Sequence, residues 1–340
     1  MTELTGHSDL PGVAFAPLCQ MARAEAVEHG LEILHGTEAK LTVQTHYGRL
    51  SFSPVQGGTR AEIRAPHADF LQTLKDPLVD QISSVFPESA QQIRWSDAAS
   101  AGQLPDNAWV MSVAHVSALA GGFLRVTLKG DVSRFSQAAI HFRLGLPPEG
   151  RAAEWPTIGV TGATQWPKGD AKLHLPVYTA RDVRPDAGEL LFDLFQHDGG
   201  RATRWAETVP AGTEILVTGP GGGGCKIDSP IRAFADDTGF PAVARILEAN
   251  PDLTGRISLY PSSAYGAAYP LPRHGGVEVV WEPPCTRDTM AGTAVSAITA
   301  HGEAFLWFAG EKRLAAEVRA AWKQSGRVAQ EAPISAYWQR

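Results

Sequence analysis

The rhythm of the expected secondary structure changes once along this chain of 340 residues, near Gly222. Between Trp109 and Gly222, about six short runs of alternating apolar residues are separated by glycine- and proline-containing turns, which predicts a closed antiparallel β-barrel. After Gly222, strand-like and helix-like runs alternate, which predicts a parallel α/β sheet. The stretch 149–172 is long, so we expect an insertion or flap there rather than a strand pair.

The first hundred residues have a third pattern of expected helices and strands, which is typical of a small α+β domain. Helical spacing predicts helices at 17–29 and 67–85, and apolar alternation predicts strands at 41–47, 50–52, 59–65 and, as a last short strand, 93–95. Small polar residues make 96–107 the expected linker. We therefore expect three domains, at 1–100 (α+β), 108–222 (barrel) and 228–340 (α/β).

Composition narrows the functional class. The net charge is −6 and there is no basic block, which argues against a nucleic-acid partner. Cys19, Cys225 and Cys285 are far apart, which argues against a disulfide framework, a zinc site and an iron–sulfur cluster. The sequence contains no signal-peptide pattern and no apolar run of membrane-spanning length. We expect a cytoplasmic protein without stable membrane insertion.

The most informative local segment is 197–206, which reads His-Asp-Gly-Gly-Arg-Ala-Thr-Arg-Trp-Ala. A turn on Gly199 and Gly200 that opens a helix directs several backbone N–H groups and the positive end of the helix dipole to one place. That arrangement suits a pyrophosphate. By itself, however, such a turn is more often only a connection between elements.

Four further blocks stand at characteristic distances from this turn. They are Val-Tyr-Thr-Ala-Arg at 177–181, Ile-Leu-Val-Thr-Gly-Pro-Gly-Gly at 215–222 with the run 235–247 after it, Trp-Phe-Ala-Gly-Glu at 307–311, and Ala-Tyr-Trp-Gln-Arg at 336–340. In this order, from about Trp109 to Arg340, the chain resembles the siderophore-interacting protein family. These are FAD-dependent ferric-siderophore reductases related to ferredoxin-NADP reductases, and the resemblance implies a ferredoxin reductase-like fold.

The resemblance implies that FAD is the cofactor, NADH or NADPH the electron donor and a ferric siderophore the substrate. It assigns the catalytic positions to Tyr178, which would pack on the isoalloxazine ring, and Thr179, which would hydrogen-bond near the reactive nitrogen. The alternative is that Tyr178 is an ordinary residue of a barrel strand. Hydride transfer needs no protein nucleophile, so the lack of a Ser-His-Asp or Cys-His pattern agrees with this assignment.

The remaining candidate residues follow from the same blocks. On the barrel, alternation places His141 and Arg143 on one strand face, which borders either the flavin, the siderophore or solvent. Lys312 and Arg313 open a helix where cations oppose the dipole, which indicates an anionic ligand such as cofactor phosphate or an acidic siderophore. The other candidate cofactor-binding residues are Arg181, His197, Gly199, Gly200, Ala202, Thr203, Arg204, Asp236, Thr238, Glu311 and Trp338.

One position departs from the family pattern. Its Arg-x-Tyr-Thr motif begins with an arginine that pairs with flavin phosphate, and this chain has Pro176 there, with neither charge nor N–H. Losing such a contact costs about 1.5–3 kcal/mol, or roughly ten- to a hundredfold in FAD affinity. The possible substitutes are Lys172, His174, Arg181 and Arg204.

These observations favour an NAD(P)H-dependent ferric-siderophore reductase that releases iron by reducing it to Fe(II). Two other functions remain open: a flavin-free protein of the same fold that binds a siderophore or another acidic metabolite, and a flavin oxidoreductase with a non-iron substrate. The sequence does not distinguish NADH from NADPH, identify the siderophore, or assign a role to the N-terminal domain or an oligomeric state.

Overall fold

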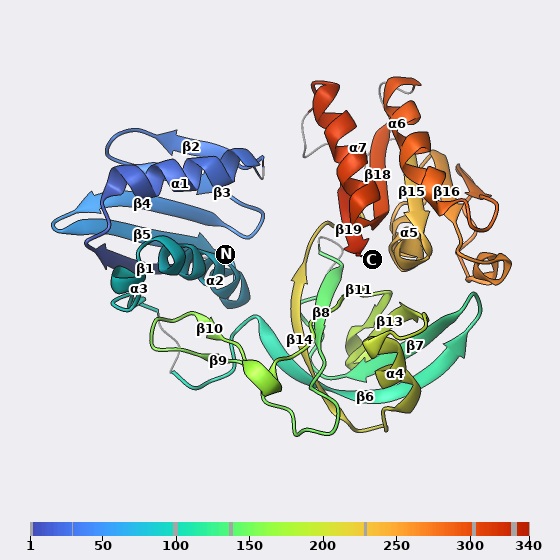
Figure 1. Cartoon of the computed structure of the whole chain (residues 1–340), viewed down its shortest axis with the longest axis horizontal. Coiled ribbons are helices and arrows are strands. Elements are labelled where there is room, and N and C mark those ends of the chain that lie inside the picture. The colour runs from blue at the N-terminus through green and yellow to red at the C-terminus, as the bar shows by residue number, and fades with distance from the viewer. Residues whose placement is uncertain are drawn as a thin grey trace. The chain divides into compact units, whose positions relative to one another are not determined.

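The computed structural model describes residues 3–28, 30–97, 101–135, 139–227, 230–300, 304–327 and 332–339 (Figure 1). The chain forms two compact units. The N-terminal unit consists of Met1–Trp109 together with Pro147–His174, and the C-terminal unit of Val110–Leu146 together with Leu175–Arg340. Part of the expected linker, residues 98–100, lies outside the described residues, as do 228–229 and Arg340 of the expected α/β domain.

The N-terminal unit is built on an antiparallel sheet with the strand order β1-β5-β4-β3-β2. One face of this sheet, including Phe52, Ala61 and Ile63, shares a buried apolar cluster with two long helices. This confirms the α+β class expected of the region. The elements are β1 (Leu4–Pro11), α1 (Phe15–Glu28), β2 (Glu32–Gly36), β3 (Leu41–Gln44), β4 (Arg49–Val55), β5 (Gly58–Ala65), α2 (Ala68–Val85) and α3 (Pro87–Ala90).

The edge of this sheet explains one wrong prediction. Residues 93–95 form no strand, although they run beside β1. The backbone N–H of Ser96 donates to His7 O at 2.8 Å, but His7 N–H and Arg94 N–H donate to the hydroxyls of Ser96 and Ser8. Side-chain hydroxyls thus replace most of a regular ladder. The strand β1 itself was not predicted because its buried face carries Gly6, Ser8 and Leu10 rather than an apolar series.

The expected insertion packs within the N-terminal unit. The expectation that it holds no strand pair was wrong, because it contains the short antiparallel pair β9 (Thr157–Ile158) and β10 (Thr164–Gln165). The half-buried carboxylate of Asp76 on α2 accepts hydrogen bonds from the backbone N–H and the hydroxyl of Thr164, at 2.8 and 2.7 Å. Gly102 of the expected linker donates its N–H to Ile158 O at 2.9 Å. Residues 101–107 and 147–174 therefore belong to the fold of the N-terminal unit.

The first half of the C-terminal unit is an antiparallel sheet with the order β11-β8-β14-β6-β7-β13-β12. Its two edge strands are separated in sequence by only Ala180 and Arg181. The N–H of Ala180 donates to Ile140 O at 2.7 Å and that of Arg181 to Leu191 O at 2.8 Å, which closes the sheet as a barrel. The strands are β6 (Ala108–Leu119), β7 (Phe123–Lys129), β8 (His141–Gly145), β11 (Val177–Thr179), β12 (Asp182–Arg184), β13 (Glu189–Phe195) and β14 (Glu214–Gly221), with helix α4 (Arg201–Thr208) after β13.

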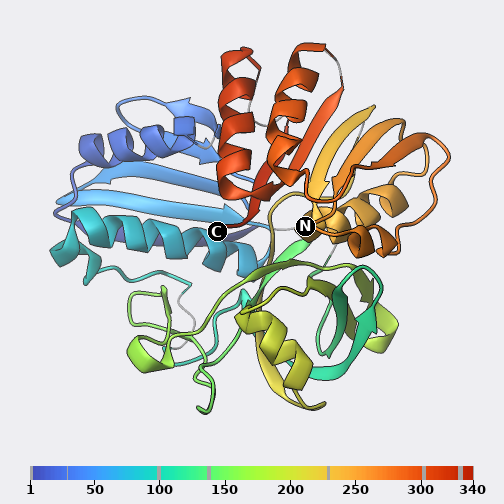
Figure 2. The same cartoon turned by 45° about the vertical axis from the view of Figure 1, so that its right-hand side comes forward.

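The second half is a five-stranded parallel sheet with the order β17-β16-β15-β18-β19, as predicted. Helix α5 packs against one face, and α6 and α7 pack together against the other (Figure 2). The strand order reverses between β15 and β18, so ligands are expected at the carboxyl ends of these two strands. The elements are β15 (Ile231–Asp236), α5 (Phe240–Ala249), β16 (Gly255–Tyr260), β17 (Val277–Trp281), α6 (Met290–Ala300), β18 (Phe305–Glu311), α7 (Lys312–Gln324) and β19 (Ile334–Trp338).

Candidate functional site

The predicted catalytic pair lies on β11, where strand alternation turns Tyr178 and Thr179 in opposite directions. The Tyr178 ring is half-buried, with its centre 4.8 Å from that of Phe192 and 6.3 Å from that of Phe142. Burial raises the pKa of Tyr178, so its hydroxyl stays protonated. The tyrosine therefore offers a flat aromatic face and a neutral donor.

Thr179 takes part in a hydrogen-bonded network that joins the barrel to the last strand of the parallel sheet. Its hydroxyl lies 3.4 Å from Nδ1 of His141, and Nε2 of His141 lies 3.1 Å from the hydroxyl of Tyr337 on β19. Burial, aided by the positive charge of Arg245, lowers the pKa of His141 to about 4. The imidazole is therefore neutral at physiological pH. One of its nitrogens carries a proton, and the other can accept a hydrogen bond.

The strand β8 places its two predicted residues differently. His141 pairs with Thr179 across β8 and β11, and Arg143 pairs with Val177. Arg143 is exposed, and its Nη1 donates to Leu175 O at 3.4 Å. The structure thus keeps Arg143 on the strand that carries the His141 network, with its guanidinium at the surface.

The glycine-rich turn forms as the sequence indicates. Gly199 has a φ of 74°, a conformation that favours glycine, and a side chain at Gly200 would meet the ring of His197 and the hydroxyl of Thr203. Gly200 is the N-cap of α4 and has no side chain to cap the first turn, whose amides include those of Ala202 and Thr203. Both glycines are therefore required by the local geometry, and the helix end has the form of an anion cradle.

The side chains of this turn hold its shape. The buried Thr203 hydroxyl accepts a hydrogen bond from His197 N–H at 3.4 Å, rather than capping α4. The exposed guanidinium of Arg204 donates to Gly199 O at 2.9 Å. His197 is exposed. Thr203 and Arg204 thus stabilise the turn, while His197 stands at its surface.

The turn and the β11 residues belong to one region of the barrel. Phe192, against which Tyr178 packs, lies on β13, the strand that leads into the turn. At the start of α4, Nη2 of Arg201 donates to Leu146 O at 3.4 Å. The first turn of this helix therefore lies beside the residue that follows β8. An aromatic surface, a glycine turn and an uncapped helix end together suit a flavin with its phosphates, and the residues present fit FAD.

The structure commits Arg181 to a carboxylate. Its two terminal nitrogens each donate to Glu248 on α5 at 2.7 Å, and its side chain is only 12% exposed. This pair holds the barrel against the parallel sheet, so Arg181 is a poor substitute for the arginine missing at Pro176. The backbone at Pro176 is regular, because its carbonyl oxygen accepts a hydrogen bond from the Leu144 N–H at 3.0 Å. Lys172 and His174 belong to the N-terminal unit.

At the carboxyl end of β15, the predicted residues Asp236, Thr238 and Trp338 form one cluster. The fully buried carboxylate of Asp236 accepts from the Thr238 hydroxyl at 2.6 Å and from Nε1 of Trp338 at 2.7 Å. Burial raises the pKa of Asp236. In Asp237 beside it, burial and the charge of Asp236 raise the pKa to about 6, although Ser262 N–H donates to its carboxylate at 3.0 Å.

Glu311 and the two basic residues after it occupy the end of β18 and the start of α7. Oε2 of Glu311 accepts from the N–H of Arg313 at 2.9 Å and of Leu314 at 3.3 Å, so the buried glutamate is the N-cap of α7. Lys312 Nζ donates to Gln339 Oε1 at 3.3 Å, and Arg313 is 65% exposed. The glutamate has a structural task, while the cations stand at the surface of the same sheet end.

Two residues at this sheet end were left out of the predicted site. Tyr337 completes the His141 network, and Arg287, between β17 and α6, stacks on Trp338 with its guanidinium carbon 5.0 Å from the ring centre. The sequence offered a signal for Tyr337, which stands in the block 336–340, but none for Arg287.

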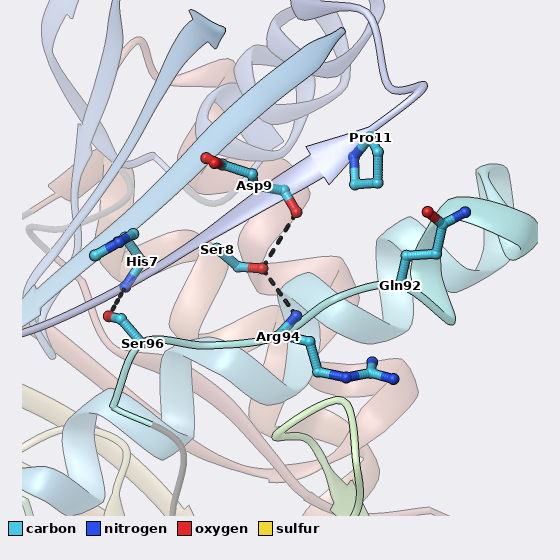
Figure 3. Close-up of a pocket in the computed structure, with 7 residues that line it drawn as sticks. All are labelled: His7, Ser8, Asp9, Pro11, Gln92, Arg94 and Ser96. Atoms are coloured by element: carbon cyan, nitrogen blue, oxygen red, sulfur yellow. Dashed lines mark hydrogen bonds between the residues drawn. The ribbon is translucent and has the colours of Figure 1, made fainter. Parts of the chain in front are cut away.

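A separate hollow lies on the N-terminal unit, beside the edge strand β1 (Figure 3). It has a volume of about 400 Å³ and is lined by His7, Ser8, Asp9, Pro11, Gln92, Arg94 and Ser96. Asp9 in its wall is held by Arg60 in a paired contact of 2.7 and 2.9 Å.

Among the residues that the structure describes, no group of three or more His, Cys, Asp and Glu side chains is arranged to hold a metal ion. No helix in the same part of the chain is long and apolar enough to cross a membrane.

Comparisons with known proteins agree with the two halves of the C-terminal unit. Residues 112–224 match the siderophore-interacting FAD-binding domain, and residues 231–340 match the siderophore-interacting protein family. The chain is 27% identical over 242 residues to the NADPH-dependent ferric-chelate reductase of Escherichia coli (strain K12), covering 67% of this chain and 91% of that protein.

Solved structures show the same fold. The siderophore-interacting protein SipS from Aeromonas hydrophila has a TM-score of 0.55 at 23% identity, covering 69% of this chain and 99% of its own. A siderophore utilization protein from T. fusca has a TM-score of 0.53 at 24% identity, with 71% and 96% covered. With an antiparallel barrel before a parallel sheet and both family models matched in order, this chain belongs, over residues 112–224 and 231–340, to the siderophore-interacting protein family.

Proposed function

We propose that this protein is an FAD-dependent NAD(P)H:ferric-siderophore oxidoreductase. The observation that carries the proposal is the 3.1 Å contact between His141 of the barrel and Tyr337 of β19. It joins β8, the neighbour of the strand that carries Tyr178 and Thr179, to the parallel sheet, whose carboxyl end is where nucleotides bind in such folds. A flavin held on the barrel and a nicotinamide held by the sheet can meet at such a junction.

The residues proposed to hold FAD lie on the barrel. The uncapped first turn of α4, with Gly199, Gly200 and Ala202, would receive the pyrophosphate, and Arg143 and Arg204 would add positive charge at the surface. Tyr178 would cover the ring system. Thr179 and His141 would contact its reactive edge. When bound, FAD supplies the means to accept a hydride and to pass electrons on singly, which amino-acid side chains lack.

The protein side of the mechanism is to orient and to exclude water. The neutral His141 has one ring N–H and one acceptor nitrogen, so it can hold the hydroxyls of Thr179 and Tyr337 in place by hydrogen bonds without carrying a charge. Tyr178 and Tyr337 stay protonated because burial raises the pKa of each. His141, Tyr178 and Tyr337 are therefore all uncharged at neutral pH.

The proposed substrate is Fe(III) held by a siderophore through hard oxygen ligands. Reduction to Fe(II) weakens those ligands and releases the iron. Lys312 and Arg313 are proposed to attract an acidic siderophore or a cofactor phosphate. The location that goes with a supply of NAD(P)H is the cytoplasm. We propose functional domains at 1–100, 108–222 and 228–340, the second of which carries the segment 147–174 that packs in the N-terminal unit.

Three measurements test this function in sequence. Flavin-stripped protein is titrated with FAD by flavin fluorescence, and saturation at one FAD per chain is expected. Anaerobic NADPH or NADH should then bleach the visible flavin spectrum. Addition of a ferric siderophore should restore the spectrum and yield Fe(II), trapped by a ferrous-specific dye. If FAD fails to bind at tens of micromolar, the flavoenzyme is excluded.

The second candidate is a flavin-free binding protein, which Pro176 favours because it removes a phosphate-pairing arginine. In that case the stripped protein would bind the ferric siderophore with the same affinity whether or not FAD is present. A flavin oxidoreductase with another substrate would instead bind FAD, be bleached by NAD(P)H, and yield no Fe(II).

A further inference from the structure

Arg287 is linked through Trp338 to the carboxyl end of β15. It lies in the connection between β17 and α6, and its guanidinium stacks on Trp338, the last residue of β19. Trp338 in turn donates to the buried Asp236 at the end of β15. Through Trp338, the arginine therefore lies near the carboxyl end of β15, the region of the sheet where doubly wound folds bind their ligands.

The arginine is held in place while part of its hydrogen-bonding capacity is unused. The side chain is half-buried, and its Nε is buried with no hydrogen-bond partner among the described residues. A buried N–H of a charged group without a partner costs free energy, and such groups usually have a ligand or water. Stacking on an indole fixes the plane of a guanidinium but leaves its edge free to pair with a planar or tetrahedral anion.

One carboxylate that acts on Arg287, that of Asp236, is already engaged by other hydrogen-bond donors. The positive charge of Arg287 lowers the pKa of Asp236, against the larger opposing effect of burial. That carboxylate already accepts hydrogen bonds from Thr238 and Trp338. The oxygen atoms of Asp236 thus serve donors other than Arg287.

We propose that Arg287 is the residue that binds a phosphate group of the nicotinamide dinucleotide, with Trp338 as the platform that orients it. The phosphate is either the pyrophosphate shared by NADH and NADPH or the 2′-phosphate found only in NADPH. Phosphate is the anion that suits a guanidinium edge, and it is the anion common to both donors. This assignment rests on the proposed function, since it names a residue for the nucleotide of that reaction.

The test is a calorimetric titration of the whole protein with NADP⁺ and with NAD⁺. It measures binding directly and needs no turnover. R287Q should weaken binding by about ten- to a hundredfold, the effect of losing a charged hydrogen bond. R287K should lose less, because it keeps the charge but not the planar fork. The matched control is R256Q, which removes a half-exposed arginine from the amino end of β16 and should leave both affinities unchanged.

The pattern of losses identifies the phosphate. Weakening of both nucleotides assigns Arg287 to the pyrophosphate, and weakening of NADP⁺ alone assigns it to the 2′-phosphate. If R287Q, with an unchanged melting temperature, binds both nucleotides as the unsubstituted protein does, the assignment is wrong while the proposed function stands. If the unsubstituted protein binds neither nucleotide, both are wrong.

Discussion

The hydroxyl of Tyr269 donates a 2.7 Å hydrogen bond to Oδ2 of Asp193, whose side chain is completely buried in the C-terminal unit. Arg125 completes the contact with two hydrogen bonds to the same carboxylate, at 2.7 and 2.8 Å. Asp193 and Arg125 lie on neighbouring barrel strands, whereas Tyr269 follows β16 of the parallel sheet. This buried charge is thus shared between the two halves of the unit and joins them.

Replacing Tyr269 with Phe should therefore destabilise the C-terminal unit by about 1.5–3 kcal/mol, because a buried carboxylate loses a hydrogen bond. Chemical denaturation followed by tryptophan fluorescence measures the change. The matched control is Y265F, since Tyr265 is 60% exposed and its hydroxyl should contribute little. Equal losses in the two variants would show that the Asp193 contact is not a joint.

His141 predicts that stability falls as the pH decreases from 7 to 4. Its folded pKa of about 4 lies below the ordinary value of 6.5, so the unfolded chain binds a proton in this range and the folded chain does not. The loss attributable to this residue is up to about 3 kcal/mol. The charged group that faces it is Arg245, and Thr179 and Tyr337 are its neutral partners.

The check is the free energy of unfolding of H141Q measured across this pH range. Glutamine keeps hydrogen-bonding capacity without titrating, so the difference between the variant and the parent should shrink as the pH falls. H115Q is the control, because His115 is exposed on β6. A constant difference across the range would mean that His141 titrates normally.

Asp237 predicts the opposite dependence. Its folded pKa of about 6 is above the ordinary 3.8, so its ionised form opposes folding at pH 7 and this cost disappears as the pH falls through 6 towards 4. D237N should stabilise the protein at pH 7 by up to about 3 kcal/mol and by little at pH 4. The amide oxygen can still accept from Ser262 N–H. D252N, at an exposed position, should change neither value.

Pro176 makes a prediction about cofactor affinity. P176R restores a guanidinium at the first position of the strand motif, while the acceptor for Leu144 N–H is a backbone oxygen that any residue supplies. FAD should bind about ten- to a hundredfold more tightly, as judged by flavin fluorescence. P251R, at an exposed position after α5, controls for the added charge. Unchanged affinity in P176R would mean that other residues already satisfy the phosphates.

The architecture of the C-terminal unit was predictable because its patterns are local. Alternation along β7, β8 and β13 and the helical spacing of α5 and α7 are visible in the sequence, and tertiary packing reinforced them. The strand β1 was not predictable in this way, because small residues, Gly6 and Ser8, fill its buried positions. Nor was the packing of residues 147–174, which depends on Asp76 and Thr164, two polar residues 88 positions apart.

In the candidate site, too, local features were predictable from the sequence and long-range contacts were not. The turn at Gly199 and Gly200 has a local geometry that its residues require. The partners of Arg181 and Arg287, by contrast, come from distant elements: Glu248 lies on α5 and Trp338 on β19. No spacing in the sequence reports that one arginine is paired with a carboxylate while the other stacks on an indole.

The hairpin of β9 and β10, held by Asp76, has a consequence for how such a chain can change over time. The N-terminal unit is completed by a segment encoded inside the barrel, between β8 and β11. Trimming the gene from its 5′ end would remove the residues on which that segment packs, and excising the segment would remove the contacts that Gly162 and Thr164 make with Gln72 and Asp76. The two units are thus interleaved, and they must be inherited together or remodelled together.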